Sequence, residues 1–235
     1  MATFNCRSLF LSDDLLRLSS DIAGNDTAIE TTIGEHINHL VYFRNIQCNT
    51  NENVRVIVLS ALGPVFSAGH DLNEMRSDER EVLTRCSAMM TAIVASEKSI
   101  IACVSGIATA GGCQLVAACD LAIAANTAKF CTPGVNIGGF CTTPLVAIGR
   151  KIHRKHAMEM ALTGDMFSAD DAMRFGLVNR VYDEDEVREE VRVLAKKIAS
   201  KSSIAIAHGK KAFYQQMDMP LEEAYHFATE KMIES

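Results

Sequence analysis

The sequence predicts an α/β protein whose parallel sheet is covered by helices on both faces. The first observation is a set of short apolar runs typical of buried strands, at residues 54–60, 100–104 and 121–124. The second is that segments with helical periodicity separate these runs. Strands that alternate with helices along a chain indicate parallel pairing with right-handed crossovers.

The segment before the first strand is predicted to be helical. Apolar residues recur at helical spacing over residues 12–22, after two aspartates that suit a helix N-terminus. Residues 25–53 show helical spacing from Ile33 to Val41 and then become polar, which favours a helix followed by a loop. We therefore predict an N-terminal helical segment over residues 1–53.

Residues 54–182 are predicted to form the α/β core. A loop containing Gly69 follows the first strand, and a helix is expected over residues 81–96. This helix carries one apolar stripe that we assign to the core, formed by Val82, Cys86, Met89, Met90, Ile93 and Val94. After the strand at 100–104, the turn at Gly111 and Gly112 opens a helix that runs to about residue 118, before the strand at 121–124.

The remainder is predicted to be mostly helical. Ser168 with Asp171 is typical of a helix start, and Gly176 of a helix end. A short strand is expected at 178–182, followed by a helix to about residue 200 that Asp183 and Glu186 would cap. Two helices at 203–217 and 221–233 complete a C-terminal helical region, residues 183–235. No repeat or linker divides the chain, which favours one core with a helical appendage.

Composition narrows the class of protein. The 235 residues are 48% hydrophobic and 22% charged, which is a globular balance and excludes a disordered or fibrous chain. A net charge of -6 and a pI near 5.6 argue against nucleic acid as the main partner. The most apolar stretch, residues 100–125, is interrupted by glycine, glutamine and aspartate, so no membrane span is predicted.

Cysteine usage indicates a reducing compartment. None of the 8 cysteines forms a Cys-x-x-Cys pair, and most lie in apolar runs. We interpret them as reduced, mostly buried thiols rather than as disulfides or zinc ligands. The first 26 residues show neither a secretory core nor a good transit peptide, because four aspartates accompany two arginines.

Two glycine-containing loops carry the functional signal, because α/β proteins bind ligands where strands end. The first is residues 66–72 (FSAGHDL) and the second is residues 104–115 (VSGIATAGGCQL). Backbone N–H groups at Gly111 and Gly112 could cradle an anion or oxyanion, but a glycine pair is also a common packing turn. Both interpretations remain open, while the two phosphate-binding glycine motifs of nucleotide sites are absent.

These two loops, with CDLAIA at 119–124 and FCTPGVNIG at 130–138, resemble the crotonase (enoyl-CoA hydratase/isomerase) superfamily over about residues 54–214. The resemblance implies a crotonase-like spiral of ββα units with a C-terminal helical region, here apparently truncated at both ends. It also implies a coenzyme A thioester as substrate or ligand, no separate cofactor, and a homotrimer or hexamer. Several stretches look most like a mitochondrial member, which implies a mitochondrial protein of fatty-acid metabolism.

The resemblance also implies where the site lies. In this superfamily two backbone N–H groups form an oxyanion hole for the thioester oxygen, and the matching residues are His70 and Gly111. The imidazole of His70 is not expected to act. Residues 70–73 would line the adenine end of coenzyme A. The implied substrate-binding residues are therefore Ala68, His70, Asp71, Leu72 and Gly111.

Two departures bear on the chemistry. Hydratases of the superfamily use two glutamates, and the matching positions hold Gln114 and Gly134, which cannot exchange a proton with water. We therefore expect weak or altered catalysis, such as thioester hydrolysis, decarboxylation or slow hydration. Two alternatives remain open: a non-catalytic acyl-CoA binding or regulatory protein, and a partner subunit of complete crotonases. The basic residues between 150 and 156 could receive phosphates, but we favour a solvated helix start.

Overall fold

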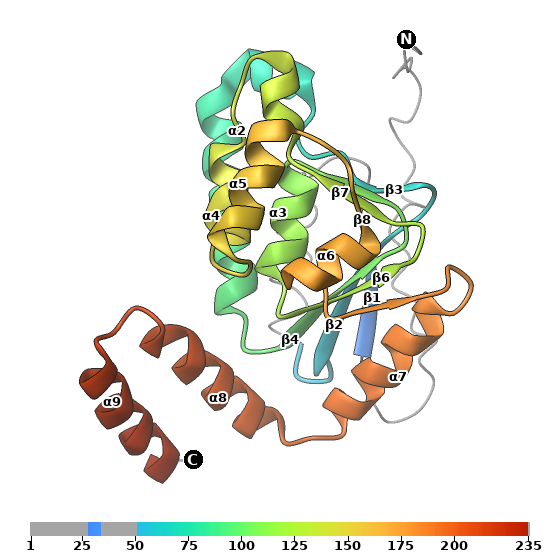
Figure 1. Ribbon diagram of the computed structural model, residues 1–235. Coiled ribbons are helices and arrows are strands. Elements are labelled where there is room, and N and C mark those ends of the chain that lie inside the picture. The colour runs from blue at the N-terminus through green and yellow to red at the C-terminus, as the bar shows by residue number, and fades with distance from the viewer. Residues whose placement is uncertain (1–27, 34–50, 235) are drawn as a thin grey trace.

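The structure is a computed structural model that describes residues 28–33 and 51–234 (Figure 1). Within these ranges, one sheet has five parallel strands in the order β1-β2-β4-β6-β9. They are β1 (Ala28–Ile33), β2 (Val56–Ala61), β4 (Ser99–Val104), β6 (Leu121–Ala125) and β9 (Arg180–Tyr182). The predicted strands at 54–60, 100–104, 121–124 and 178–182 are confirmed, with small shifts at their ends.

A second, smaller sheet consists of strands too short to show in the sequence pattern. In the described part of the chain its order is β3-β5-β7-β8, with β7 and β8 antiparallel. The strands are β3 (Val65–Ser67), β5 (Ile107–Thr109), β7 (Lys129–Cys131) and β8 (Phe167–Ser168). Strands β2, β4 and β6 are each followed by a short strand and then by helix, so the predicted spiral of ββα units is confirmed.

Strand β1 corrects the interpretation of the N-terminal segment. Residues 28–33 pair in parallel with β2 from Ala28 opposite Val56 to Ile33 opposite Ala61, so the helical interpretation is wrong there. The local sequence AIETTI is rich in β-branched residues, which favour a strand, and pairing with β2 outweighs the helical spacing of Ile33 with later residues. The other predictions for residues 1–27 and 34–50 lie outside the described residues.

Helices cover both faces of the five-stranded sheet, as predicted. One face and helices α2 (Leu72–Ala95) and α3 (Gly111–Ala118) share the larger apolar cluster, which includes Ile57, Leu59 and Met89. The other face packs against α7 (Val187–Ala199) in a smaller cluster with Val58 and Ile101. Neighbouring residues on β2 thus point to opposite faces, as the pleat requires.

Helix α2 begins earlier than predicted. Asp71 caps it, because its Oδ1 accepts a hydrogen bond of 2.7 Å from the Asn73 N–H. Asp78 has non-helical angles (φ -154°, ψ 77°), and this kink separates the first turns from the apolar stripe. The stripe itself is confirmed at its centre, where Cys86, Met89, Met90 and Ile93 are buried.

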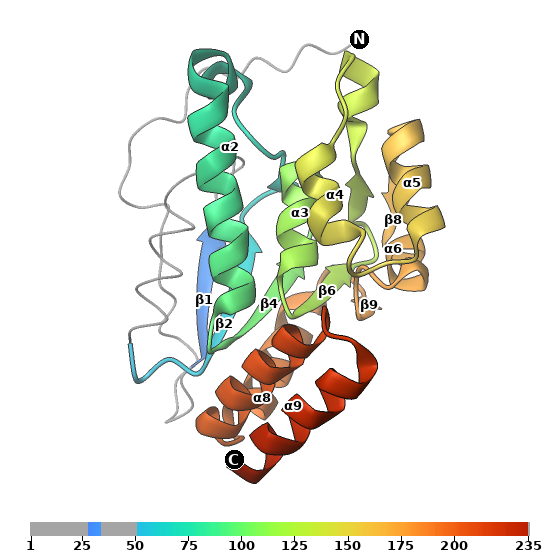
Figure 2. The ribbon, with the colours of Figure 1, turned by 90° about the vertical axis from the view of Figure 1, so that its left-hand side faces the viewer.

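The remaining elements end in a helical hairpin. After the short 3-10 helix η2 (Pro133–Ile137) come α4 (Thr142–Ile148), α5 (Arg154–Thr163) and α6 (Ala169–Phe175). Helices α8 (Ser203–Gln216) and α9 (Leu221–Glu234) lie beside one another below the carboxyl end of α3, as Figure 2 shows. The division at residues 53 and 182 stays a prediction.

The two predicted helix starts have different outcomes. Ser168 and Asp171 form a reciprocal capping box on α6, and Gly176 ends that helix, as predicted. The predicted capping role of Asp183 and Glu186 on α7 is wrong, because α7 has no side-chain cap. Asp183 instead accepts a hydrogen bond of 2.7 Å from the Asn126 side chain, which joins β9 to the end of β6.

The cysteines within the described ranges are free and buried, at positions 86, 103, 113, 119, 131 and 141. Over the same ranges no helix is long and apolar enough to cross a membrane. Nor does the described part of the chain bring together three histidine, cysteine or acidic residues that could hold a metal ion.

Candidate functional site

The first predicted loop is fixed to the second sheet. Gly69 adopts φ +91°, a left-handed conformation that favours glycine, and its N–H donates to the Ser67 hydroxyl at 3.3 Å. The Thr109 hydroxyl donates to the Ala68 carbonyl at 3.1 Å. The second of these bonds joins the loop before α2 to the end of β5, within the second predicted loop.

The two predicted loops meet at Gly69 and Gly111. A β-carbon on Gly69 would lie 3.1 Å from the Gly111 backbone nitrogen and 3.4 Å from the Ala110 β-carbon. His70 is the next residue after Gly69, so the structure brings both predicted oxyanion residues to one place. His70 is half-buried and Gly111 is buried.

The turn before α3 is strained. Ala110 has φ 46° and ψ -112°, the single non-glycine residue with positive φ in the described ranges. Its N–H donates to the Cys131 carbonyl at 2.9 Å, which holds this conformation against β7. Non-glycine residues in such conformations concentrate at functional sites, because the surrounding structure must offset the strain.

The two glycines of this turn have different roles. A β-carbon on Gly112 would lie 2.2 Å from the Ser67 carbonyl oxygen, so Gly112 is required for packing. Gly111 is the first residue of α3, where a backbone N–H has no acceptor within the helix. The packing interpretation is therefore confirmed at Gly112, while the role of Gly111 as a donor stays a prediction.

The other predicted binding residues surround the start of α2. Asp71 is half-buried and its carboxylate caps the helix, so this group is already used within the fold. Ala68 is exposed, and the side chain of Leu72 is 61% exposed. The structure thus places two accessible apolar side chains beside the Gly69 turn.

Gln114 and Gly134, the two positions expected to replace glutamates, lie in different surroundings. Gln114 is buried one turn into α3, and its Oε1 is 3.9 Å from the Cys86 thiol, which donates to it from α2. A β-carbon on Gly134 would lie 3.0 Å from both the backbone nitrogen and the Sγ of Cys141. Cys141 therefore occupies the space where a side chain at 134 would begin.

Cys141 beside Gly134 belongs to a group of three interacting thiols, with Cys113 and Cys131. Burial, with a smaller effect of Cys141, raises the pKa of Cys131 to about 11. Burial also raises the pKa of Cys141, although the Gly134 backbone offsets part of that effect. The pKa of Cys113 is raised too, first by burial and then by the other two thiols. These thiols remain protonated at neutral pH and are poor general bases.

The basic cluster serves the fold. His153 caps α5, where its Nδ1 accepts a hydrogen bond of 3.3 Å from the Lys155 N–H. His156 stacks on Phe175 with ring centroids 4.0 Å apart. Arg150 donates to the Val146 carbonyl at 3.0 Å, and Lys151 to the Tyr214 hydroxyl at 3.1 Å. Most of this group is exposed and lies at the start of α5, which agrees with the favoured interpretation of a solvated helix start.

Sequence reasoning missed the residues that shape the site by packing and backbone strain. The strain at Ala110, the contact of Ser67 with Gly112 and the thiol of Cys141 against Gly134 depend on segments distant along the chain. The one local signal was the glycine pair itself, because close backbone contact demands glycine.

Comparison with known proteins agrees with this geometry. The family model described as Enoyl-CoA hydratase/isomerase matches residues 31–235. The chain therefore belongs to the enoyl-CoA hydratase/isomerase family, the crotonase superfamily that its loops resemble.

Individual relatives support the assignment. The chain is 47% identical over 190 residues to the Rattus norvegicus protein named enoyl-CoA hydratase domain-containing protein 3, mitochondrial; the match covers 79% of this chain and 63% of that relative. It is similar to the crystal structure of the human enoyl Coenzyme A hydratase domain-containing protein 3, with 38% identity, a TM-score of 0.84 and coverage of 89% and 88%. It also resembles an enoyl-CoA hydratase of Mycobacterium smegmatis, with 39% identity, a TM-score of 0.88 and coverage of 93% and 90%.

Proposed function

We propose that this chain binds acyl-CoA thioesters and has weak or altered catalysis that relies on an oxyanion hole. The backbone N–H groups of His70 and Gly111 would receive the thioester oxygen. The observation that carries the proposal is that the two loops meet. A β-carbon added to Gly69 would lie only 3.1 Å from the backbone nitrogen of Gly111.

The proposed chemistry is stabilisation of an enolate. Removing a proton or carbon dioxide next to a thioester places negative charge on the thioester oxygen. Donors that are already fixed in place stabilise this charge by several kcal/mol, about 3 kcal/mol for each well-placed N–H. The strained Ala110 turn and the Gly69 contact would provide that fixed geometry.

The same site offers little general acid or base chemistry. The amide of Gln114 can hold water by hydrogen bonds but cannot accept its proton, and Gly134 has no side chain. Loss of one such group typically lowers the rate by about 10²- to 10⁴-fold. Decarboxylation is the reaction that needs least from this site, because departure of carbon dioxide forms the enolate without a base. Thioester hydrolysis and slow hydration are further candidates.

A second candidate function is acyl-CoA binding without catalysis, in a regulatory protein or a partner subunit of complete crotonases. The raised pKa values of Cys113, Cys131 and Cys141 favour it, because the titratable groups beside Gly134 stay neutral and protonated. Turnover of a bound acyl-CoA would support the catalytic candidate, and binding without turnover would support the second one.

The remaining parts of the proposal concern binding, location and assembly. Ala68, Asp71 and Leu72 would line the coenzyme A side of the Gly69 turn, with no separate cofactor. Because relatives are named mitochondrial, we place the chain in the mitochondrion, in fatty-acid metabolism. We also propose a homotrimer or hexamer. Cell fractionation and light scattering coupled to size-exclusion chromatography test these two statements.

The experiment that tests the catalytic proposal restores the glutamates. Gly134→Glu needs space, because the Sγ of Cys141 lies 3.0 Å from the new β-carbon, so it is combined with Cys141→Ala, which removes this sulfur. We expect fast crotonyl-CoA hydration only when Gln114→Glu and Gly134→Glu are both present. Cys141→Ala alone is the matched control and should stay at the wild-type rate. Hydration by the wild type as fast as by the restored variant would contradict the proposal.

A further inference from the structure

The hydroxyl of Thr132 is buried beside the candidate site and has no hydrogen-bond partner among the described residues. Thr132 follows Cys131, whose carbonyl accepts the N–H of Ala110 in the strained turn. It also precedes η2, but its side chain does not cap that helix. A hydroxyl that leaves water without gaining a partner destabilises the fold. Such a group in a native structure calls for an explanation, and a ligand could supply the missing partner.

A second polar group with unused hydrogen-bonding capacity is the side-chain amide of Gln114. Gln114 lies three residues after Gly111, so both residues are on the same face of α3. The side chain is buried, and in the described part of the chain its one hydrogen-bond partner is the Cys86 thiol, 3.9 Å from Oε1. Because Oε1 faces this weak donor, the Nε2 group is left to donate to a ligand.

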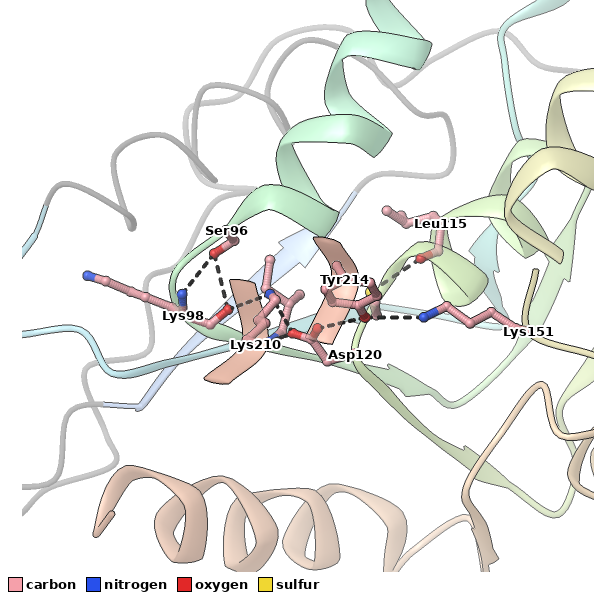
Figure 3. Close-up of polar contacts among 9 residues, drawn as sticks. Ser96, Lys98, Leu115, Asp120, Lys151, Lys210 and Tyr214 are labelled. Carbon is pink, nitrogen blue, oxygen red and sulfur yellow. Dashed lines mark hydrogen bonds and ion pairs between the residues drawn. The ribbon is translucent and has the colours of Figure 1, made fainter. Parts of the chain in front are cut away.

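Helix α3 holds Gln114 in place from both ends. At its start, the Gln114 backbone N–H donates to the Ala110 carbonyl at 3.0 Å. Just beyond its end, Asp120 accepts hydrogen bonds from Lys210 Nζ at 2.8 Å and from the Tyr214 hydroxyl at 3.1 Å, as Figure 3 shows. Side chains on such a fixed element lose little freedom when a ligand binds, which favours affinity.

The spacing of the donors indicates which part of an acyl group they would meet. Residues three positions apart on a helix have β-carbons about 5 to 6 Å apart. With the thioester oxygen on the Gly111 N–H, the Gln114 amide would therefore reach a group attached to the carbon next to the thioester, the α-carbon. Thr132 approaches the same turn from the end of β7.

The chemistry of the two groups favours an anionic substituent. A carboxylate only accepts hydrogen bonds and offers several acceptor positions, which suits the amide of Gln114 and the hydroxyl of Thr132. These donors are neutral, so they orient a carboxylate with less stabilisation than a cation would give. The raised pKa values of Cys113, Cys131 and Cys141 keep these thiols protonated, so they do not repel an anion.

We propose that Gln114 and Thr132 form a subsite for a carboxylate on the α-carbon, which makes the substrate class an α-carboxyacyl-CoA such as malonyl-CoA. This inference rests on the proposed function and makes it more specific. The bond between the α-carbon and the carboxylate breaks, carbon dioxide leaves, and the electron pair moves into the enolate on His70 and Gly111. The α-carbon then takes one proton from the solvent, which gives acetyl-CoA. Cys86 is a positioning residue, because it contacts Gln114 rather than the ligand.

Two thioesters of similar shape test the subsite. Isovaleryl-CoA carries an isopropyl group where malonyl-CoA carries its carboxylate. We expect the wild type to bind malonyl-CoA at least tenfold more tightly, because a hydrogen bond to a charged group changes affinity by about tenfold or more. Calorimetric titration gives the two dissociation constants. Mass spectrometry of the same samples measures the acetyl-CoA formed, so that the malonyl-CoA concentration can be corrected.

Variants show whether the preference comes from the proposed residues. Gln114→Met and Thr132→Val each remove a hydrogen-bonding group at similar volume and should each lower the preference at least fivefold. Cys86→Ala should lower it less, and Cys86→Ser, which keeps a donor, should restore it. The matched control Thr91→Val, at an exposed position on α2 whose hydroxyl donates to the Ser87 carbonyl, should leave it unchanged. A purely structural role would weaken both thioesters and leave their ratio unchanged.

The outcomes separate the subsite from the proposed function. Equal or tighter binding of isovaleryl-CoA by the wild type would overturn the subsite and leave the proposed function standing. A preference for malonyl-CoA that persists in both Gln114→Met and Thr132→Val would do the same. Binding of malonyl-CoA without formation of acetyl-CoA would overturn the decarboxylation step alone. If the wild type binds neither thioester, the subsite and the proposed function both fail.

Discussion

Gly112 and Ser67 approach so closely that a β-carbon on Gly112 would lie 2.2 Å from the Ser67 carbonyl oxygen. Gly112 is the second residue of α3, and Ser67 is the last residue of β3. The contact presses the start of α3 against the second sheet. It therefore fixes where the neighbouring Gly111 N–H lies relative to the Gly69 turn.

Gly112→Ala should destabilise the fold and weaken ligand binding. The new methyl group would have to displace backbone, and overpacking of this kind costs about 1 to 3 kcal/mol. The control is Gly209→Ala in α8, where nothing lies within 4 Å of the new carbon and the gain should be about 0.5 to 1 kcal/mol. Urea unfolding measures both changes. Equal stability of Gly112→Ala and the wild type would contradict the packing role.

Substitution of Ala110 should show that its backbone is strained. Ala110→Gly removes the strain of the positive φ of 46°, which should stabilise the folded state by about 1 to 3 kcal/mol. Glycine also raises the entropy of the unfolded chain, and the relief of strain offsets this loss of stability. We expect this variant to melt no lower than the wild type. Ala110→Val adds a β-branched side chain and should melt clearly lower. A loss of stability in Ala110→Gly as large as that in Ala110→Val would show that Ala110 is not strained.

Asp171→Asn should weaken the start of α6 in a pH-dependent way. Hydrogen bonds from Ser168 lower the pKa of Asp171 in the folded protein. The carboxylate therefore contributes its full share to folding stability above the pKa of the unfolded chain, about 3.9, and this share is lost as the pH falls through the lower pKa of the folded state. We expect a loss of about 1 kcal/mol at about pH 7. The difference from the wild type should shrink below about pH 3. A loss of the same size at both pH values would exclude a role for the carboxylate charge.

The six described cysteines should resist alkylation in the native protein. Burial raises the pKa of the thiols at positions 86, 113, 119, 131 and 141, in the case of Cys86 to about 11. Little reactive thiolate is therefore present at neutral pH. Peptide mapping by mass spectrometry after iodoacetamide treatment should find these six modified only after unfolding. Rapid native modification of Cys141 would indicate an accessible thiol beside Gly134.

The sequence predicted those elements whose signal is local and whose length is sufficient to show a hydrophobic pattern. Strands β2, β4 and β6 are continuous apolar runs, and the capping box of Ser168 and Asp171 lies within four consecutive residues. The short strands β3, β5 and β7 span three residues each, too few to establish an alternation. Strand β1 was mistaken for helix because its stabilisation comes from pairing with β2.

The candidate site divides in the same way. His70 and Gly111 could be predicted as site residues, because glycine turns and a family resemblance mark them. The contacts of Ser67 with Gly112 and of Cys141 with Gly134 carry no local pattern, because they join segments that are distant along the chain.

Calorimetric titration of the chain with acetyl-CoA and free coenzyme A, followed by mass spectrometry of the same samples, tests the central claim most directly. We predict saturable binding with preference for the thioester, because the His70 and Gly111 N–H groups would hold its oxygen. We also predict that Gly112→Ala loses this preference. Absence of binding, or equal binding of acetyl-CoA and coenzyme A by the wild type, would contradict an oxyanion hole at these residues.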